Sequence, residues 1–268
     1  MTGGLVAAYD ATGPTWQQGP GRIYDRLAAV VVERCPTLDA TSLVLDLGAG
    51  TGAATRAIQR TGAQVVAFDA AFGMLAHGRR DSVSCLGDAN RLPFTDDAFT
   101  AVIAAFSLNH LATPAVAMRE AARVTIDHGM ILASAYAIDD NHPAKSAVDD
   151  AARAAGWAEP SWYGELRREA MPQLSTVDRA IAVAQSAGLL DANAEVVRVA
   201  FPELTPHELV AWRLGMAHLA PFVNSLEPDR RLRLWRDAHQ RTTGMPTLVR
   251  SIVVLSAGGA PSQPSQPS

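Results

Sequence analysis

The chain has 268 residues, of which 48% are hydrophobic and 19% charged, and its formal net charge is −4. This length favours one domain with additions, and no stretch gathers the Lys and Arg that a nucleic-acid substrate requires. Cys35 and Cys85 are isolated in the sequence, and no apolar run approaches a membrane span or a signal segment. We therefore expect a cytoplasmic protein that binds neither nucleic acid nor a membrane.

The stretch from residue 43 to residue 58 organises the chain. Residues 43–47 form a short apolar run typical of a buried parallel strand, and Gly48, Gly50 and Gly52 follow before a helical pattern at 53–58. Glycines let a backbone approach a ligand closely, and a helix start offers free N–H groups. Dinucleotides and S-adenosylmethionine (SAM) are both bound by such turns.

Asp46 lies two residues before the first glycine, at the end of the strand. A carboxylate there would attract a cationic group such as an α-ammonium and would repel a pyrophosphate. The glycine spacing, with Ala53 in the last position, also satisfies the loose dinucleotide fingerprint. A nicotinamide-dependent reductase therefore stays open at this point.

Two further acidic residues follow predicted strands. Asp69 ends the strand 64–69, at nearly the spacing from Asp46 at which a carboxylate meets ribose hydroxyls in nucleotide-binding folds. Asp88 follows the strand 82–86. Because ligands of open α/β sheets bind at the carboxyl ends of strands, the three carboxylates predict one site.

Residues 44–52 (VLDLGAGTG) closely resemble the first motif of class I SAM-dependent methyltransferases. Gly87-Asp88-Ala89, followed by Leu-Pro-Phe at 92–94, resembles the motif whose Asp receives the adenine amino group, which a nicotinamide enzyme would not need. The resemblance implies SAM as cofactor and S-adenosylhomocysteine (SAH) as product. It implies cofactor contacts from Tyr9, Asp46, Gly48, Ala49, Gly50, Gly52, Asp69, Ala70, Met74, Gly87, Asp88, Ala89, Phe106 and Ser107.

His110 follows the predicted strand 96–106, where a methyl acceptor would approach. Its ordinary pKa lies near neutrality, so it is the candidate general base; the alternative is a residue that only shapes the pocket. No group of His, Cys or acidic residues has metal-ligand spacing, so we expect no metal. Candidate acceptor contacts, each of which also suits a purely structural role, are Trp16, Asn109, Trp162, Trp212 and Met216.

The remaining pattern predicts an α/β fold, a Rossmann-like seven-stranded class I methyltransferase sheet with helices on both faces and a helical cap. Further strands are expected at 130–134, 195–200 and 248–255, with a turn at 127–129 and an aromatic loop at 156–164. Further helices are expected at 22–34, 70–75, 115–124, 144–155, 176–186, 205–218 and 228–241.

The expected organisation alternates core and inserted segments. Residues 1–40 form an N-terminal helical lid, 41–135 the SAM-binding core, and 136–175 a helical insertion. The core resumes at 176–200, a helical cap insertion occupies 201–245, the last core strand occupies 246–256, and 257–268 form a disordered tail rich in Pro, Ser and Gln.

These features predict a SAM-dependent methyltransferase (EC 2.1.1.-) acting by SN2 on an O, N or C nucleophile of a small molecule, as in quinone or natural-product biosynthesis. We expect a monomer or homodimer. Two alternatives stay open, a SAM-binding protein that uses the fold for another reaction such as a cyclisation, and a nicotinamide-dependent reductase. No acceptor-specific motif is present, so the acceptor and the methylated atom are not predicted.

Overall fold

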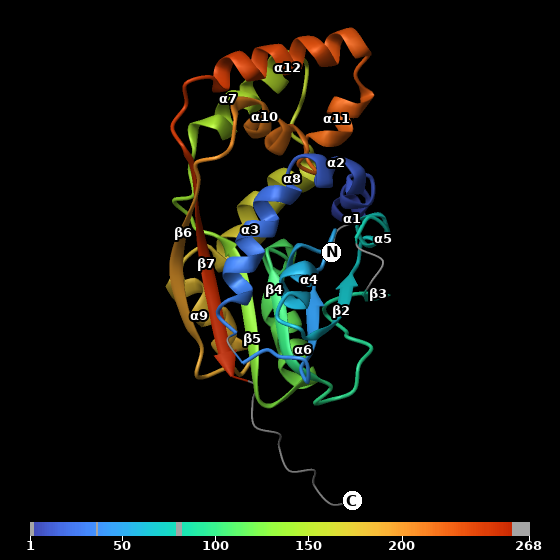
Figure 1. The fold of residues 1–268 in the computed structure, drawn as a ribbon, viewed down its shortest axis with the longest axis vertical. Coiled ribbons are helices and arrows are strands. Elements are labelled where there is room, and N and C mark those ends of the chain that lie inside the picture. Colours follow the sequence, from blue (N-terminus) through green and yellow to red (C-terminus); the bar gives the residue numbers. More distant parts are fainter. Residues whose placement is uncertain (1–2, 36, 79–81, 259–268) are drawn as a thin grey trace, which may run out of the picture.

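A computed structural model describes residues 3–35, 37–78 and 82–258, and places them around one seven-stranded sheet with the strand order β3-β2-β1-β4-β5-β7-β6 (Figure 1). Strands β1 to β5 run parallel where they pair, and β7 is antiparallel to both β5 and β6. The strands are β1 Leu43–Leu47, β2 Gln64–Asp69, β3 Val83–Leu86, β4 Phe99–Ala105, β5 Thr125–Tyr136, β6 Asn193–Phe201 and β7 Leu248–Gly258.

The central position of β1 explains its apolar sequence. Leu45 pairs with Val66 of β2 on one side and with Val102 of β4 on the other. Alternate side chains of a strand point to opposite faces, so a strand covered on both faces is apolar throughout. Val44 accordingly belongs to one hydrophobic core and Leu45 to the other.

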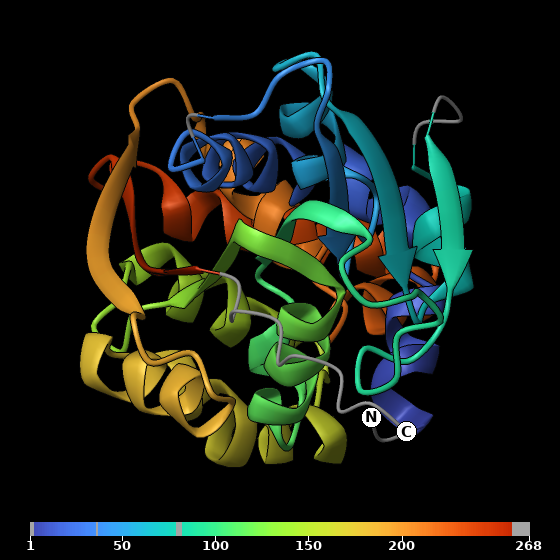
Figure 2. The same ribbon diagram turned by 90° about the horizontal axis from the view of Figure 1, so that it is seen from below.

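Helices cover both faces of the sheet, as Figure 2 shows. Helices α3 (Gly21–Val32) and α4 (Ala53–Gln59) bury Leu27 and Ile58 on the face of Val44. Helices α6 (Pro114–Val124) and α9 (Val177–Ser186) bury Met118 and Ala180 on the opposite face. The sheet is therefore the middle layer of three.

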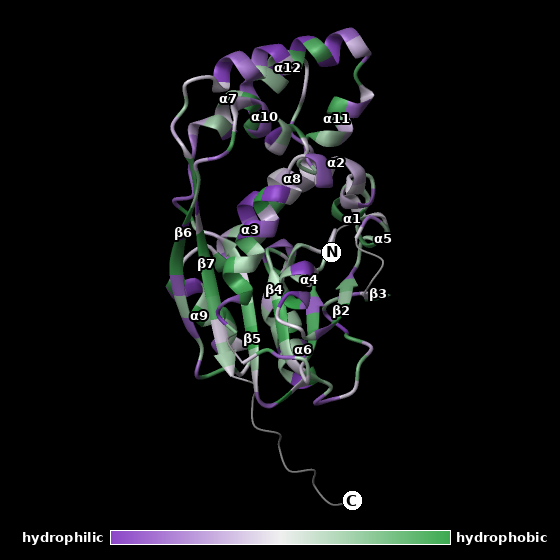
Figure 3. Ribbon diagram, viewed as in Figure 1, coloured by the Kyte–Doolittle hydropathy of each residue, from purple (hydrophilic) through white to green (hydrophobic). Residues whose placement is uncertain are grey.

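A helical cap stands beyond the carboxyl ends of the parallel strands (Figure 1). It consists of α7 (Pro143–Ala154), α10 (Pro206–Leu214), α11 (Ala220–Ser225) and α12 (Pro228–Thr242). Val148, Val210 and Leu234 share a hydrophobic core of its own. The sheet strands are largely hydrophobic and α12 is largely hydrophilic (Figure 3), as expected for an amphipathic helix at the surface.

Three short helices lie between the sheet and this cap: α1 (Gly3–Asp10), α2 (Gly13–Gln18) and α5 (Phe72–Ala76). The Asp10 carboxylate accepts a hydrogen bond from Gly73 N at 2.7 Å. A Cβ on Gly73 would lie 2.0 Å from Asp10 O, so α1 and α5 touch where a side chain would not fit. Both α1 and α2 fall within the predicted helical lid of residues 1–40, although the sequence pattern assigns a helix there only to residues 22–34.

Three expected details differ from the structure. The predicted turn at 127–129 lies inside β5, where the pairing with β4 shifts register and His128 adopts a left-handed φ of 61°. This irregularity is a bulge rather than the end of a strand. The predicted aromatic loop contains the start of a helical segment, formed by α8 (Ser161–Glu165), a π-helical turn (Leu166–Ala170) and a 3₁₀ turn (Met171–Leu174).

The predicted helix 205–218 is shorter than expected, and α11 follows it after a turn at Gly215. Thr205 caps α10 as expected, since its side chain accepts from Glu208 N while Glu208 accepts from Thr205 N. The first two positions of the predicted disordered tail, 257–268, belong to β7 (Leu248–Gly258), because they pair with β5. The rest of the predicted tail lies outside the described residues.

We expect Gly73→Ala to loosen α1 without disturbing the sheet. The added methyl would force Asp10 O away, and overpacking of this kind costs about 1–3 kcal/mol. Amide hydrogen exchange in α1 should therefore accelerate by roughly tenfold or more. Gly258→Ala is the matched control, because it lies at the end of β7, outside α1, and a methyl group there meets nothing within 4 Å. Unchanged exchange in α1 would show that this contact does not hold the helix.

Candidate functional site

A first cavity lies at the carboxyl ends of β1, β2 and β4, beneath α1 and α2. Its lining combines residues of the N-terminal helices, the glycine turn after β1 and the residues after β4. Twelve of the predicted cofactor residues line it: Tyr9, Asp46, Gly48, Ala49, Gly50, Asp69, Ala70, Met74, Gly87, Ala89, Phe106 and Ser107.

The glycine turn has the backbone that its sequence predicts. Gly48, Gly50 and Gly52 have φ values of 79°, 55° and 85°, in the left-handed region that favours glycine. A Cβ on Gly48 would lie 2.2 Å from the Cβ of Ser107, whose hydroxyl donates to Leu47 O. The turn is therefore pressed against the residues after β4 and needs glycine for that approach.

Asp69 joins the turn to the end of β2. Its carboxylate accepts hydrogen bonds from Gly50 N at 2.7 Å and from Ala71 N at 2.8 Å. Burial raises the pKa of Asp69 above its ordinary value. Two N–H donors do not exhaust the acceptor sites of a carboxylate, so Asp69 can still bind ligand hydroxyl groups.

Asp46 is more deeply buried, with 1% of its surface exposed. Its carboxylate accepts a hydrogen bond from the Thr55 hydroxyl at 2.5 Å. Burial raises the pKa of Asp46 to about 7, and the charge of Asp69 adds to this effect. The first cavity thus has two carboxylates in its lining and neither Lys nor Arg among the described residues there. Its electrostatics favour a cationic ligand and oppose a pyrophosphate.

His110 lies on a 3₁₀ turn (Leu108–His110) that follows β4. Its Nε2 is 3.3 Å from the Tyr9 hydroxyl, which is within hydrogen-bonding distance. Burial lowers the pKa of His110 to about 4, so the imidazole is neutral at physiological pH and can accept a proton or a hydrogen bond.

A second cavity of about 480 Å³ lies between the sheet and the helical cap. It shares Tyr9, Tyr24, Phe106 and His110 with the first cavity, so these four residues form the boundary between the two. Tyr24 packs edge-on against Phe106, with ring centroids 5.3 Å apart. A molecule in the second cavity would therefore meet the contents of the first at an aromatic boundary that includes His110.

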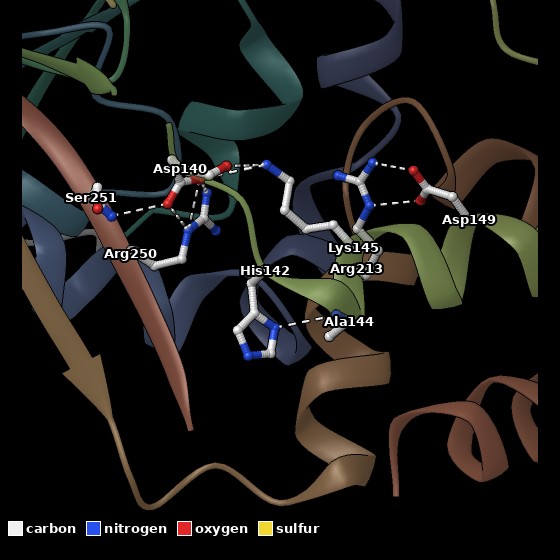
Figure 4. Close-up of polar contacts among 8 residues, drawn as sticks. All are labelled: Asp140, His142, Ala144, Lys145, Asp149, Arg213, Arg250 and Ser251. Carbon is white, nitrogen blue, oxygen red and sulfur yellow. Dashed lines mark hydrogen bonds and ion pairs between the residues drawn. The ribbon is translucent and has the colours of Figure 1, made fainter. Parts of the chain in front are cut away.

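The far side of the second cavity carries charged residues (Figure 4). Arg250 of β7 pairs with Asp140, and Arg213 of α10 pairs with Asp149 of α7. Lys145 extends from α7 between these two ion pairs. Lys145 and Asp149 are four residues apart, which places them on the same face of the helix.

The structure separates the predicted residues into two groups. Asn109, Trp162, Trp212 and Met216 line the second cavity, as expected for acceptor contacts, whereas Trp16 lines only the first. The remaining two predicted cofactor residues, Gly52 and Asp88, line neither. Gly52 caps α4, and the exposed Asp88 accepts hydrogen bonds from Asn90 while its neighbours Gly87 and Ala89 line the first cavity.

Sequence reasoning missed all of the charged lining of the second cavity. Arg250 interrupts an apolar strand pattern, and Lys145 is the only lysine of the chain. Both residues are unusual enough in the sequence to indicate a candidate site residue. Asp140, Asp149 and Arg213 carried none, because a charged residue on a helix or in a loop is ordinarily exposed. These five residues come together only through the packing of the cap on the sheet.

The strand order, the antiparallel β7 and the glycine turn after β1 define the class I methyltransferase fold. Residues 45–133 match the family of methyltransferase domains. Residues 45–133 are therefore similar to a methyltransferase domain, within a chain that has the class I methyltransferase fold. In the residues described here no helix has the length and apolar character needed to cross a membrane, and no group of three or more metal-ligating side chains occurs.

Individual relatives agree with this class. The chain is 37% identical over 142 residues to the demethylmenaquinone methyltransferase of Mycobacterium tuberculosis, and the match covers 53% of this chain and 59% of that protein. The chain thus spans about three fifths of the length of the relatives that it matches.

Solved structures share the fold at low sequence identity. A putative methyltransferase from an antibiotic biosynthesis pathway of Anabaena variabilis has a TM-score of 0.57 at 16% identity, over 84% of this chain and 96% of that one. The [4+2]-cyclase SpnF has a TM-score of 0.52 at 20% identity, over 89% of this chain and 81% of that one.

We expect Asp46→Asn to stabilise the ligand-free protein at neutral pH. The folded pKa of Asp46 is about 7 and its ordinary value is 3.8, so its contribution to stability is present below pH 4 and is lost as the pH rises to 7. An amide can still accept from Thr55. The gain in free energy of unfolding should grow from near zero at pH 4 to about 2–4 kcal/mol above pH 7.

Urea unfolding of the two proteins between pH 4.5 and 8 measures this difference. Asp191→Asn is the control, because Asp191 is exposed and lines neither cavity. A gain for Asp46→Asn that does not change with pH would contradict the assignment of the titration to Asp46.

Proposed function

We propose that the protein transfers the methyl group of SAM to an O, N or C nucleophile of a small molecule. The observation that carries the proposal is the charge of the first cavity, where the buried Asp46 and the half-buried Asp69 lie without a basic residue in the lining. SAM carries a sulfonium and an ammonium group against one carboxylate, so it brings a net positive charge to the two carboxylates of the lining. A dinucleotide would add negative charge to the same place.

The residues of the first cavity fit the parts of SAM. Asp69 keeps free acceptor sites for the two ribose hydroxyls, and the glycine turn with Asp46 is suited to the methionine end. Gly87 and Ala89 would lie along the adenine. Asp88 lies between them with an exposed carboxylate, and its proposed role as acceptor for the adenine amino group rests on the sequence motif. The Thr51 hydroxyl, which lines this cavity, is buried and has no hydrogen-bond partner among the described residues, as expected for a group that binds a ligand.

The second cavity is the proposed acceptor site. When bound, SAM supplies an activated methyl group, and the residues of this chain would align the acceptor and exclude water. Orientation of this kind is worth up to about 7–11 kcal/mol of the barrier. Tyr24 and Phe106 at the boundary would hold the acceptor against the methyl group, because they line both cavities.

His110 is the proposed general base for acceptors that must lose a proton. It is neutral, it lies at the boundary, and its Nε2 is near the Tyr9 hydroxyl, which can orient the ring. The low pKa makes His110 a modest base for a free proton. A developing positive charge beside the carboxylates of the first cavity would nevertheless be favourable.

The similarity to demethylmenaquinone methyltransferases supports a small-molecule acceptor of the kind found in quinone biosynthesis. The structural likeness to a cyclase concerns the fold alone, and a cyclisation needs no methyl acceptor. Product analysis separates the two reactions, because only methyl transfer converts SAM to SAH.

Calorimetric titration with SAM, SAH and NADH in parallel tests the cofactor. We expect binding of SAM and SAH and none of NADH. Asp69→Ala and Asp88→Ala should each weaken SAM binding by about 10- to 100-fold, since hydrogen bonds to a charged group are worth about 1.5–3 kcal/mol. Asp96→Ala is the control, because its exposed carboxylate pairs with Arg123 away from both cavities. Binding of NADH, or unchanged SAM affinity in both variants, would contradict the proposal.

We expect His110→Gln to lower kcat by about 10²–10⁴-fold for a phenolic acceptor and to leave SAH affinity within a few-fold. SAH formation with a panel of phenols, hydroquinones and amines measures the rate. Since the pKa of His110 is about 4, its own titration should leave the wild-type rate flat between pH 6 and 8 and reduce it as the pH falls toward 4. An unchanged kcat in the variant would show that His110 is not the general base and only shapes the pocket.

A further inference from the structure

The lining of the second cavity carries more positive than negative charge. Its basic side chains are Lys145, Arg153, Arg167, Arg213 and Arg250, and its carboxylates are Asp140 and Asp149. Arg153 and Arg167 pair with carboxylates outside this lining, those of Asp150 and Glu159. The charge balance inside the cavity therefore depends on the three remaining cations and the two carboxylates.

Arg250 is held on every side. Its Nε and Nη2 donate to the Asp140 carboxylate, which also accepts from Ser251 N at 2.9 Å. Its guanidinium carbon lies 3.9 Å from the ring centroid of Tyr136 and 4.8 Å from that of Trp212. Arg250 is thus fixed and neutralised by its partner.

Arg213 is neutralised in the same way. Its Nε and Nη2 each donate to one oxygen of the Asp149 carboxylate at 2.7 Å, and both residues lie almost entirely out of solvent. Two bidentate pairs therefore use both negative charges of this region. The side chains of each pair therefore hold each other in place, and their charges are not free to bind a ligand.

Lys145 supplies a third positive charge with no third carboxylate in the cavity lining to match it. Its ammonium donates to Asp140 O at 2.9 Å and lies 3.5 Å from Asp140 Oδ2, an oxygen that already accepts from Arg250. Burial and the charge of Arg250 lower the pKa of Lys145, although Asp140 opposes the shift. An ammonium has three donor hydrogens, so Lys145 can still donate to a ligand.

Neutral polar groups with unused capacity lie in the same lining. His218 Nε2 and Asn109 Oδ1 are buried and have no hydrogen-bond partner within the described part of the chain. His218 stacks on Tyr163 with ring centroids 3.8 Å apart, and burial lowers its pKa well below the ordinary value, with the charges of Arg213, Arg167 and Lys145 adding to this. Unused buried groups of this kind are expected where a ligand binds.

We propose that the methyl acceptor is an aromatic monocarboxylate whose carboxylate is bound by Lys145 between the two arginine–aspartate pairs. The inference rests on the proposed function and names its substrate class. One uncompensated positive charge matches a monoanion better than a phosphate dianion. The aromatic rings of Tyr24, Phe106 and Trp162 in the lining suit a flat apolar body.

The same geometry separates the bound carboxylate from the methylated atom. Lys145, Arg213 and Arg250 line only the second cavity, whereas His110 lines both. The nucleophile would therefore be a second group of the acceptor, placed at the His110 boundary, and the carboxylate would remain unesterified in the product.

The single lysine makes a direct test practicable. Growth on ¹³C-labelled lysine labels Lys145 alone, and it keeps both the positive charge of the ammonium group and its three donor hydrogens. The labelled protein, saturated with SAH, is titrated with 2-naphthoate, with its neutral analogue 2-naphthamide and with 2-naphthyl phosphate, and followed by NMR. We expect 2-naphthoate to shift the Lys145 signal and to bind at least tenfold more tightly than either of the others.

Unlabelled variants measured by calorimetry complete the test. Lys145→Met should remove the preference for the acid, Lys145→Arg should retain it, and Arg241→Met, a change on the surface of α12, should leave it unchanged. The proposal is overturned if the amide or the phosphate binds as tightly as the acid, if no naphthalene ligand binds, or if Lys145→Met keeps the preference.

The SAH titration keeps this proposal separate from the proposed function. Lys145 does not line the first cavity, so Lys145→Met should bind SAH as the wild type does. Failure of SAH to bind the wild type would count against the proposed function. Normal SAH binding without a preference for the carboxylate would count against the acceptor class alone.

Discussion

Burial of unlike charges in two adjoining cavities is the constraint on which the site depends. The sheet brings Asp46 and Asp69 together because parallel strands end at one edge, and the covering helices bury Asp46 and leave Asp69 half-buried. A carboxylate that loses water and gains no cationic partner raises its pKa, as Asp46 does. This burial costs free energy in the ligand-free protein. Such a cost is tolerated at a binding site, because there a ligand rather than a side chain can supply the positive charge.

The helices between sheet and cap create this environment. The α1–α5 contact at Gly73 closes the first cavity from above, and Tyr9 of α1 reaches His110 after β4. The same tyrosine lines the second cavity. A ligand that reorganised α1 would therefore alter both cavities, since one short helix forms part of each wall.

The central fold could be predicted from the sequence because it depends on patterns within short stretches of the chain. Strands β1 and β2 have the predicted bounds, and the left-handed glycines and the cap at Thr205 follow from the requirements of single positions. The fold class was accessible for the same reason, since an apolar strand, a glycine turn and acidic strand ends recur in a fixed order.

The second cavity was not accessible, because its lining is set by tertiary packing. Arg213 and Asp149 belong to different helices of the cap, and Asp140 and Arg250 are 110 residues apart. Trp16 shows the same limit of sequence-based prediction. A tryptophan in this segment suggests a ligand contact, but the packing of α2 decides which cavity the side chain lines. The helices α1, α2 and α11 are short, and such segments owe their structure to their neighbours rather than to propensity.

The opposite charges of the cavities have a consequence for the order of events in the proposed reaction. The first cavity favours a cation and the second an anion, so each ligand strengthens the field that attracts the other across the Tyr24–Phe106 boundary. Methyl transfer removes the sulfonium charge, and Asp46 and Asp69 then face a ligand with one positive charge fewer. Their pKa values would rise again, the attraction between the cavities would weaken, and the product pair would be held less tightly than the reactants. The arrangement therefore favours assembly of the reactive pair and release after the reaction without requiring a separate conformational switch.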